Sequence, residues 1–187
     1  MDIRERIIAA CRELARAQGF HAITVDELAY RAGVSKRTLY RYFRSKEEVI
    51  EATLDAFMQE IGSEADRLTA SRAKAADIID SMIGYLVTRG QFLTSSRGLH
   101  DLKRHYPRLW EKIVRFRAEK MQDVIAALIQ KSEREAVRRI DPRIITEAFI
   151  AAINAVANPD FILSNGMTFE ETARQLIELI KYTFTGE

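Results

Sequence analysis

A run of basic and hydroxyl side chains lies between residues 31 and 46, where six Lys or Arg residues occur without an intervening Asp or Glu. Guanidinium and ammonium groups bind phosphate oxygens, and a guanidinium can also donate two hydrogen bonds to a guanine edge. We expect Arg37, Thr38 and Arg41 to reach base edges. The residues expected to hold phosphates are Lys36, Tyr40, Tyr42 and Lys46, together with Thr24 at the start of the first helix. The complete set expected to face DNA is Thr24, Ser35, Lys36, Arg37, Thr38, Tyr40, Arg41, Tyr42 and Lys46.

Two short helices joined by a glycine turn are predicted to position these side chains. Thr24 can cap the first helix in a capping box with Glu27. Gly33 can adopt the left-handed conformation that turns the chain, and Ser35 can cap a second helix that runs through Phe43. This pattern predicts a helix-turn-helix whose second helix enters the major groove.

The charge distribution supports this interpretation over an ordinary amphipathic hairpin with solvated basic residues. Residues 1–50 contain ten Lys or Arg and seven Asp or Glu, whereas residues 51–187 contain nineteen and twenty. The positive charge of the chain is therefore concentrated at one end, as expected for a surface that attracts nucleic acid.

The run GVSKRTLYRYFRSKEEVI, together with the preceding TVDELAYRA, resembles the DNA-binding domain of the TetR family of bacterial transcriptional regulators. The resemblance covers roughly residues 3–54, and the rest of the chain is similar to the family only in length, helical character and layout. It implies a homodimer that binds a palindromic operator and a small effector, with repression as the expected mode. In the family a small residue or proline often stands where this chain has Arg37, which leaves the operator sequence open.

The periodicity predicts an all-α fold of about nine helices, with a three-helix unit at residues 1–48 and an effector-binding and dimerisation bundle at residues 49–187. The first predicted helix runs from Asp2, as its cap, to Gln18, and the two helices of the helix-turn-helix follow. A fourth helix begins after Ser45. The remaining predicted helices are about Ser71 to Arg89, Leu93 to Lys103, Pro107 to the mid-130s, one that begins at Asp141 and one that begins at Thr168.

Aromatic and polar residues mix in the middle of the chain, which indicates either a plain aromatic core or a ligand pocket. We favour a pocket because polar members could hold a carboxylate or hydroxyl on an otherwise apolar ligand. The predicted ligand-binding residues are Arg89, Phe92, Arg97, His100, Tyr106, Trp110, Phe116, Met121 and Asn154.

The last two long helices are apolar on more than one face, which favours pairing with their copies as a four-helix interface. The alternative is that both lie inside one monomer. The predicted interface residues are Phe149, Ala152, Ile153, Val156, Phe169, Leu176, Ile180 and Phe184.

Other classes of protein are less well supported by the sequence. No catalytic or metal-binding motif occurs, so we expect no enzyme activity, no cofactor and no metal site. No stretch approaches the roughly 20 apolar residues of a membrane-spanning helix, and we expect a cytoplasmic protein. Cys11 is predicted to pack as a buried residue. A DNA-bound adaptor that recruits a protein partner without a small ligand remains the alternative function.

Overall fold

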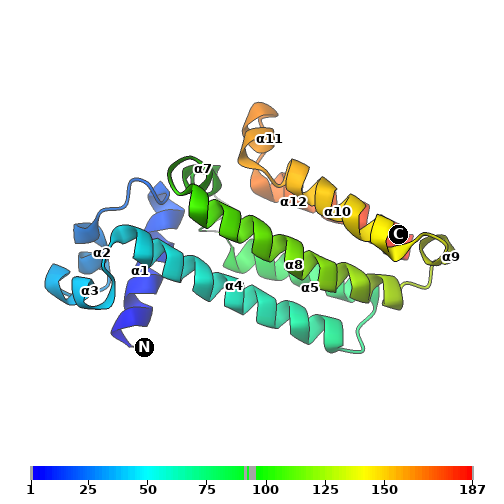
Figure 1. Cartoon of the computed structure of the whole chain (residues 1–187), viewed down its shortest axis with the longest axis horizontal. Helices are drawn as coiled ribbons and strands as arrows, with labels where there is room; N and C mark the ends of the chain where they lie inside the picture. The colour runs from blue at the N-terminus through cyan, green and yellow to red at the C-terminus, as the bar shows by residue number, and fades with distance from the viewer. Residues whose placement is uncertain (1, 91, 93–95, 187) are drawn as a thin grey trace.

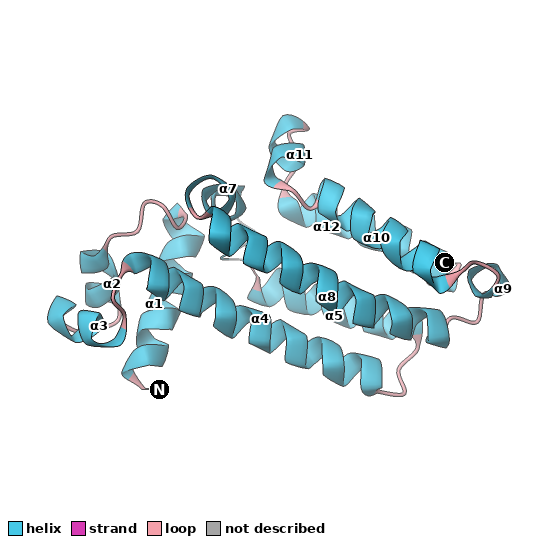
Figure 2. Ribbon diagram, viewed as in Figure 1, coloured by secondary structure: helices cyan, strands magenta, loops and turns pink. Residues whose placement is uncertain are grey.

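The computed structural model describes residues 2–90, 92 and 96–186, and within these ranges every regular element is a helix (Figure 2). Nine of the eleven helices found in the described ranges have at least seven residues. The helices are α1 Ile3–Gln18, α2 Val25–Arg31, α3 Lys36–Tyr42, α4 Lys46–Ala70, α5 Ala75–Arg89, α7 Ser96–His105, α8 Pro107–Lys131, α9 Glu135–Arg138, α10 Pro142–Val156, α11 Pro159–Ser164 and α12 Phe169–Thr185. The predicted all-α fold is confirmed.

Local capping explains why several helices begin where the sequence predicts. Asp2, Thr24 and Thr168 each form a complete capping box with the Glu three residues later. Ser45 also caps α4, because its hydroxyl accepts from the backbone N–H of Glu48. The starts of α1, α2, α4 and α12 are thus fixed by short-range hydrogen bonds.

The turn between α2 and α3 depends on a glycine. Gly33 has φ +64°, in the left-handed region that residues with a Cβ rarely adopt. The guanidinium of Arg6 on α1 donates to the carbonyls of Ala32 and Gly33 over 2.6 and 2.9 Å. Arg6 therefore holds the end of α2 against α1, a contact that the sequence pattern did not indicate.

Helix boundaries differ from the prediction in three places. The helix expected from about Ser71 begins at Ala75, because Ser71 instead caps the end of α4. The long helix ends at Lys131 rather than in the mid-130s, and the Ser132 hydroxyl donates to the carbonyl of Phe184 in the core. Helix α11 was not predicted, although Asn158 followed by proline is the same start signal that identified α10.

The predicted helix from Leu93 to Lys103 corresponds to α7, which runs to His105. Leu93 itself lies outside the described residues. α7 packs on both α1 and α8, so it joins the N-terminal helices to the bundle.

The bundle is elongated, and α4 runs from the N-terminal helices along α5 and α8, with α10 and α12 stacked on the other side of α8 and α5 (Figure 1). One core cluster includes Phe20 of the α1–α2 loop together with Phe57 of α4 and Leu102 of α7. The core is therefore continuous from the N-terminal helices into the bundle. The division after residue 48 stays a prediction.

The packing of Cys11 is confirmed, because its side chain is buried in this cluster and its thiol is free. Burial raises the pKa of the thiol to about 11, so it remains protonated near neutral pH. Within the part of the chain that the structure describes, no helix is long and apolar enough to cross a membrane.

Candidate nucleic-acid interface and ligand cavity

Helix α3 is anchored by its apolar side and presents its polar side to solvent. Leu39 and Phe43 are buried against the N-terminal core, and the Ser35 hydroxyl accepts from the backbone N–H of Thr38 at the start of the helix. The opposite face carries Arg37 and Arg41, which are exposed. This geometry fits a recognition helix, because a rigid backbone holds the side chains that can reach base edges.

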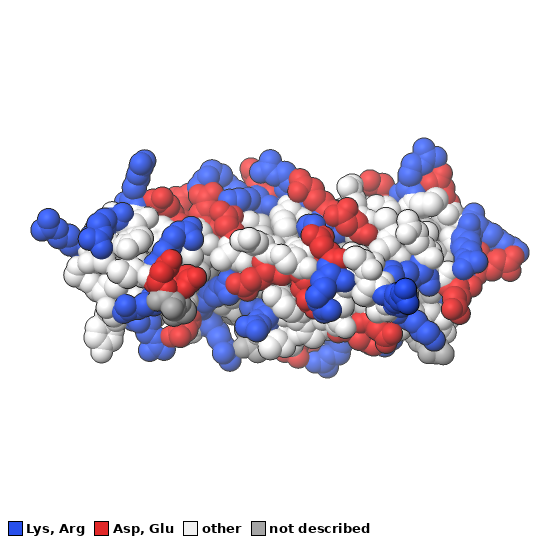
Figure 3. All heavy atoms as spheres, turned by 90° about the horizontal axis from the view of Figure 1, so that it is seen from below, with Lys and Arg blue, Asp and Glu red and all other residues white. Residues whose placement is uncertain are grey.

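The exposed side chains of α3 lie at one end of the molecule. Tyr40 and Tyr42 are 47% and 40% exposed, and the Arg41 guanidinium lies over the Tyr42 ring. Figure 3 shows basic side chains projecting from this end, whereas acidic and basic groups alternate along the rest of that face. The exposed side chains of α3 thus belong to a basic end of the molecule.

Lys36 and Thr24 belong to the same exposed region. The Lys36 ammonium pairs with Asp26 of α2 at 3.0 Å, and both side chains are more than half exposed. An exposed pair of this kind contributes little free energy, so a phosphate can replace the carboxylate. Thr24 is exposed, and its hydroxyl and its backbone N–H both donate to the Glu27 carboxylate, so a phosphate at this helix start would have to replace Glu27 as their acceptor.

Lys46 has a different environment from the one expected. Its ammonium group donates to the carbonyls of His21 and Ile23 at 2.9 Å each, and burial lowers its pKa. The side chain therefore points to the α1–α2 loop and joins that loop to the start of α4. We assign Lys46 a positioning role and leave it out of the proposed phosphate contacts.

Tyr30 is an exposed aromatic residue that sequence reasoning missed. Its side chain is 88% exposed at the end of α2, beside the turn that leads to α3. The apolar spacing of α2 already placed Tyr30 on the outer face, and this signal could have added it to the candidate phosphate contacts.

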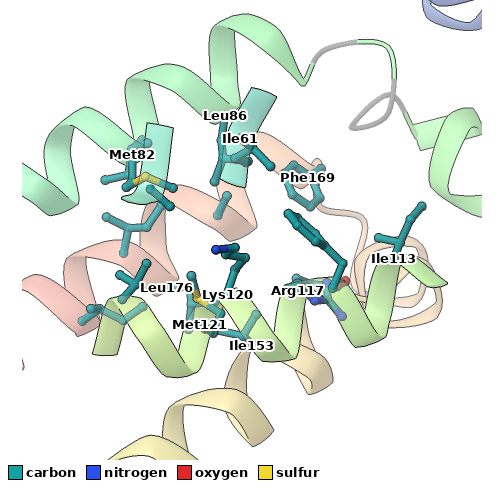
Figure 4. Close-up of a pocket in the computed structure, with 18 of the residues that line it drawn as sticks. Ile61, Met82, Leu86, Ile113, Arg117, Lys120, Met121, Ile153, Phe169 and Leu176 are labelled. Carbon is teal, nitrogen blue, oxygen red and sulfur yellow. Dashed lines mark hydrogen bonds between the residues drawn. The ribbon is translucent and has the colours of Figure 1, made fainter. Parts of the chain in front are cut away.

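An apolar cavity of about 230 Å³ lies inside the bundle. It is lined from α4, α5, α8, α10 and α12, and from Leu99 of α7 (Figure 4). The lining is aliphatic, aromatic and thioether surface almost throughout, with Met82 and Met121 on facing helices. A space with so apolar a lining suits an apolar ligand.

The five aromatic and thioether residues among the predicted ligand-binding residues divide into two groups. Trp110, Phe116 and Met121 of α8 line the cavity. Phe92 and Tyr106 are instead buried in the core beside the N-terminal helices, where the Phe92 ring contacts Phe20 and Phe57 edge-on.

The other four predicted ligand residues do not line the cavity where they are described. Arg89 is exposed at the end of α5, and His100 lies on α7 away from the lining. Asn154 accepts a hydrogen bond from Arg117 and is not part of the lining. The side chain of Arg97 is outside the described residues. The prediction grouped these polar residues with large apolar residues of one helical bundle, but α7 packs toward α1 and α11.

Sequence reasoning missed most of the cavity wall. α5 and α12 contribute Met82, Leu86, Phe169 and Leu176, and α8 contributes Arg117. The helical periodicity of α5 and α12 marks their apolar faces but does not reveal whether a face meets a neighbour or an empty space.

The predicted dimer residues mostly face inward. Ile153, Phe169, Leu176 and Ile180 line the cavity, and Phe184 is 1% exposed in the core. These five were selected as the apolar stripe of each helix, and in a single chain that stripe packs against α5 and α8. Phe149, Ala152 and Val156 are partly exposed.

Other apolar residues of the same helices are exposed. Ile144 of α10 is 64% exposed and is followed along the helix by the exposed Ala148, Ala151 and Ala155. Leu179 and Tyr182 of α12 are 54% and 61% exposed. These six residues form an outer apolar face, named here the α10–α12 face.

Comparison with known proteins agrees with the helix-turn-helix geometry. Residues 7–53 match the family described as bacterial regulatory proteins, tetR family. YvaF of Bacillus subtilis strain 168, described as an uncharacterized HTH-type transcriptional regulator, is 28% identical over 98% of this chain and 96% of its own length. The transcriptional repressor KstR of Mycobacterium tuberculosis is 32% identical over 44% of this chain and 38% of its own length.

Solved structures show the same fold over the whole chain. The transcriptional regulator FadR from Bacillus subtilis, determined in complex with stearoyl-CoA, has a TM-score of 0.64 and 18% identity, covering 94% of this chain and 96% of that one. Fold, helix-turn-helix and sequence matches together define a DNA-binding transcriptional regulator. Residues 7–53 belong to the TetR family, and the chain as a whole has the fold of a solved TetR family regulator.

Proposed function

We propose that this regulator is a homodimeric repressor that binds a palindromic operator and is released from it by a small, largely apolar ligand. The observation that carries the proposal is helix α4, which is unbroken from Lys46 to Ala70. Its first residue contacts the α1–α2 loop, and its later residues Leu54, Phe57 and Ile61 line the cavity. One rigid element therefore connects the DNA-binding helices to the ligand space.

The mechanism follows from this arrangement. A ligand that fills the cavity contacts α4 and favours a different tilt of that helix. Because the start of α4 is joined to the α1–α2 loop, a tilt moves the helix-turn-helix and changes the spacing between the two recognition helices of a dimer. Half-sites lie about one helical turn of DNA apart, so a changed spacing weakens binding.

The DNA contacts that we propose come from α2 and α3. Arg37, Thr38 and Arg41 reach base edges, while Lys36, Tyr40 and Tyr42 hold phosphates together with the start of α2 at Thr24. Residues 1–48 act as the DNA-binding domain and residues 49–187 as the effector and dimerisation domain. As a DNA-binding regulator, the protein would act in the cytoplasm.

For the dimer we propose the α10–α12 face in place of the inward residues expected from sequence. Large exposed apolar residues on adjoining helices mark an association surface, and the alanines of α10 permit close approach of a second helix. The partly exposed Ala152 and Val156 border this face.

Two similar proteins support the mode of regulation. KstR is named as a repressor, and FadR of Bacillus subtilis was crystallised with stearoyl-CoA, a ligand with a long apolar chain. Both agree with a repressor that responds to an apolar ligand.

The proposal is tested by measuring operator binding with fluorescence anisotropy, with and without a compound that calorimetry has shown to bind the protein. A regulator coupled through α4 should lose about 5- to 150-fold in operator affinity, for a coupling of about 1 to 3 kcal/mol. Operator affinity that is unchanged by every bound compound would remove the ligand-released repressor and favour the DNA-bound adaptor.

A further inference from the structure

Few polar side chains reach the wall of the cavity. Within the described residues, only Trp110, Arg117, Lys120 and Thr172 contribute a side chain with nitrogen or oxygen to its lining. The Thr172 hydroxyl is satisfied locally, because it donates to the carbonyl of Thr168 over 2.9 Å. The two charged groups of this lining, those of Arg117 and Lys120, are the candidates for holding a charged group of a ligand.

The charge of Lys120 is neutralised within the protein. Its ammonium group pairs with Asp66 of α4 at 2.8 Å and with Asp123 at 3.6 Å. These ion pairs raise the pKa of Lys120, although burial opposes them. Lys120 presents its aliphatic stem to the cavity and needs no further anion.

Arg117 has no comparable anion. Its two terminal nitrogens donate to the side-chain oxygen of Asn154 over 2.8 Å and to the carbonyl of Ala157 over 3.1 Å, and both acceptors are neutral. Its Nε is buried without a hydrogen-bond partner, and no carboxylate in the described part of the chain forms a salt bridge with Arg117. Burial lowers the pKa of this guanidinium, but a guanidinium stays charged in proteins.

The end of α10 supplies only part of the missing negative charge. Ala157 is the C-cap of α10, and a helix C-terminus carries a negative charge of roughly half an elementary unit. A full positive charge in this partly buried position, at the edge of an apolar space, remains incompletely compensated, and an anion that joined it would be stabilised. The Nε–H is an unsatisfied donor enclosed in the wall of that space, so a ligand reaches it when the Arg117 side chain turns toward the cavity.

The cavity is long rather than round. Its lining along α8 extends from Trp110 to Leu128, which corresponds to about 27 Å at the rise of an α-helix. In Figure 4, Arg117 lies toward one end with Ile113 and Phe169, while Met82 and Leu176 lie toward the other. Arg117 is seven positions from the Trp110 end of this lining and eleven from the Leu128 end, so about 16 Å of apolar wall extends on its longer side, which matches a molecule with a long tail and a single anionic head.

We propose that the cavity binds an unbranched aliphatic carboxylic acid, whose carboxylate accepts a hydrogen bond from Nε of Arg117 and whose chain covers the apolar wall. Arg117 is then the residue that selects an acid over a neutral compound of the same length. This inference rests on the proposed function, because it names the class of ligand for the same cavity.

The test compares dodecanoic acid with dodecanol by isothermal titration calorimetry on the full chain, below the concentrations at which either aggregates. The alcohol has the same chain but no charge, so the wild-type protein should bind it about tenfold or more weakly than the acid, as expected for the loss of a charged hydrogen bond. This comparison needs no variant and does not depend on the folding of one.

Arg117→Met removes the charge and keeps an unbranched stem of similar shape. It should abolish the preference for the acid while leaving alcohol binding within about threefold of wild type, a range that corresponds to under 1 kcal/mol. Arg115→Met is the matched control, because Arg115 is exposed on the same helix. It should bind both compounds as wild type does.

Three results would overturn the inference: equal affinity of wild type for acid and alcohol, a preference for the acid that survives in Arg117→Met, or no binding of either compound. None of these results contradicts a repressor released by another ligand. Conversely, an acid that binds through Arg117 but leaves operator affinity unchanged would support this inference and remove the proposed mechanism of release.

Discussion

The imidazole of His21 stacks on the imidazole of His105, with 3.7 Å between ring centroids and 14° between planes. His21 lies in the loop between α1 and α2, and His105 is the last residue of α7. The backbone N–H of His21 also donates to the Asp101 carboxylate of α7 over 2.9 Å. The stack and this hydrogen bond connect the DNA-binding helices to the bundle at a second place besides α4.

This junction should weaken in acid. The pKa of His105 lies below its ordinary 6.5, chiefly because neighbouring groups desolvate the imidazole and secondly because of the charge of His21. The Asp101 carboxylate raises this pKa by a smaller amount, and Arg104 and His100 lower it further. The folded protein therefore binds a proton at His105 less readily than the unfolded chain does. The stabilisation that neutral His105 contributes is complete at pH values above the pKa of the unfolded chain, and it is lost as the pH falls below that value. Thermal unfolding of wild type at about pH 7.5 and about pH 5.5 measures the effect.

His105→Gln serves as the comparison for that experiment. It should lower the unfolding temperature near pH 7.5 and show a smaller further loss on acidification than wild type, because no imidazole remains at that position to be protonated. If both proteins lose the same amount of stability between the two pH values, His105 is not the group responsible.

Lys46→Met should disturb the position of the helix-turn-helix rather than remove a phosphate contact. The variant loses the hydrogen bonds to the carbonyls of His21 and Ile23, and a lost pair of charged hydrogen bonds of this partly buried kind costs about 1 to 3 kcal/mol. We expect lower thermal stability and weaker DNA binding with an unchanged salt slope. A slope smaller by about one unit per subunit would instead identify Lys46 as a phosphate contact.

Arg37→Ala tests base readout from α3. Arg37 is exposed near the start of the helix, so its guanidinium is free to reach a guanine edge. The variant should lose roughly 1 to 3 kcal/mol at the operator and relax the preference at one position of each half-site. Lys36→Ala is the control, and it should weaken operator and random DNA alike. A uniform loss in Arg37→Ala would move that residue to the phosphate contacts.

If the α10–α12 face forms the dimer interface, charged residues placed on this face should separate the two chains. Ile144→Glu combined with Leu179→Glu places charges on this face and should produce monomers, because burying an unpaired carboxylate opposes association. Leu163→Glu, which changes a 49% exposed residue of α11, should leave the dimer intact. Light scattering measures the molar mass, and a double variant that remains a dimer would place the interface elsewhere.

The N-terminal helices could be predicted closely because their boundaries depend on short-range chemistry. The Thr24 cap, the Gly33 turn and the Ser35 cap involve residues at most a few positions apart. By contrast, the start of α5 depends on whether Ser71 ends one helix or begins the next, and both uses satisfy the same local preferences.

The ligand cavity and the outer face could not be located from periodicity. An apolar stripe such as Leu176 and Ile180 looks the same whether it meets another helix, a cavity or a second subunit. Arg117 also gave no local signal, because its burial results from the packing of α8 against the end of α10. These features are determined by contacts between segments far apart in the sequence.

The central claim, that this chain recognises one DNA sequence as a symmetric dimer through α3, is tested most directly by selecting bound fragments from a random DNA library. We expect enrichment of an inverted repeat whose half-sites are about one helical turn apart, with an information-rich base pair that loses its preference in Arg37→Ala. Recovery of fragments without any shared sequence, or of a single unrepeated site bound by one chain, would contradict the account.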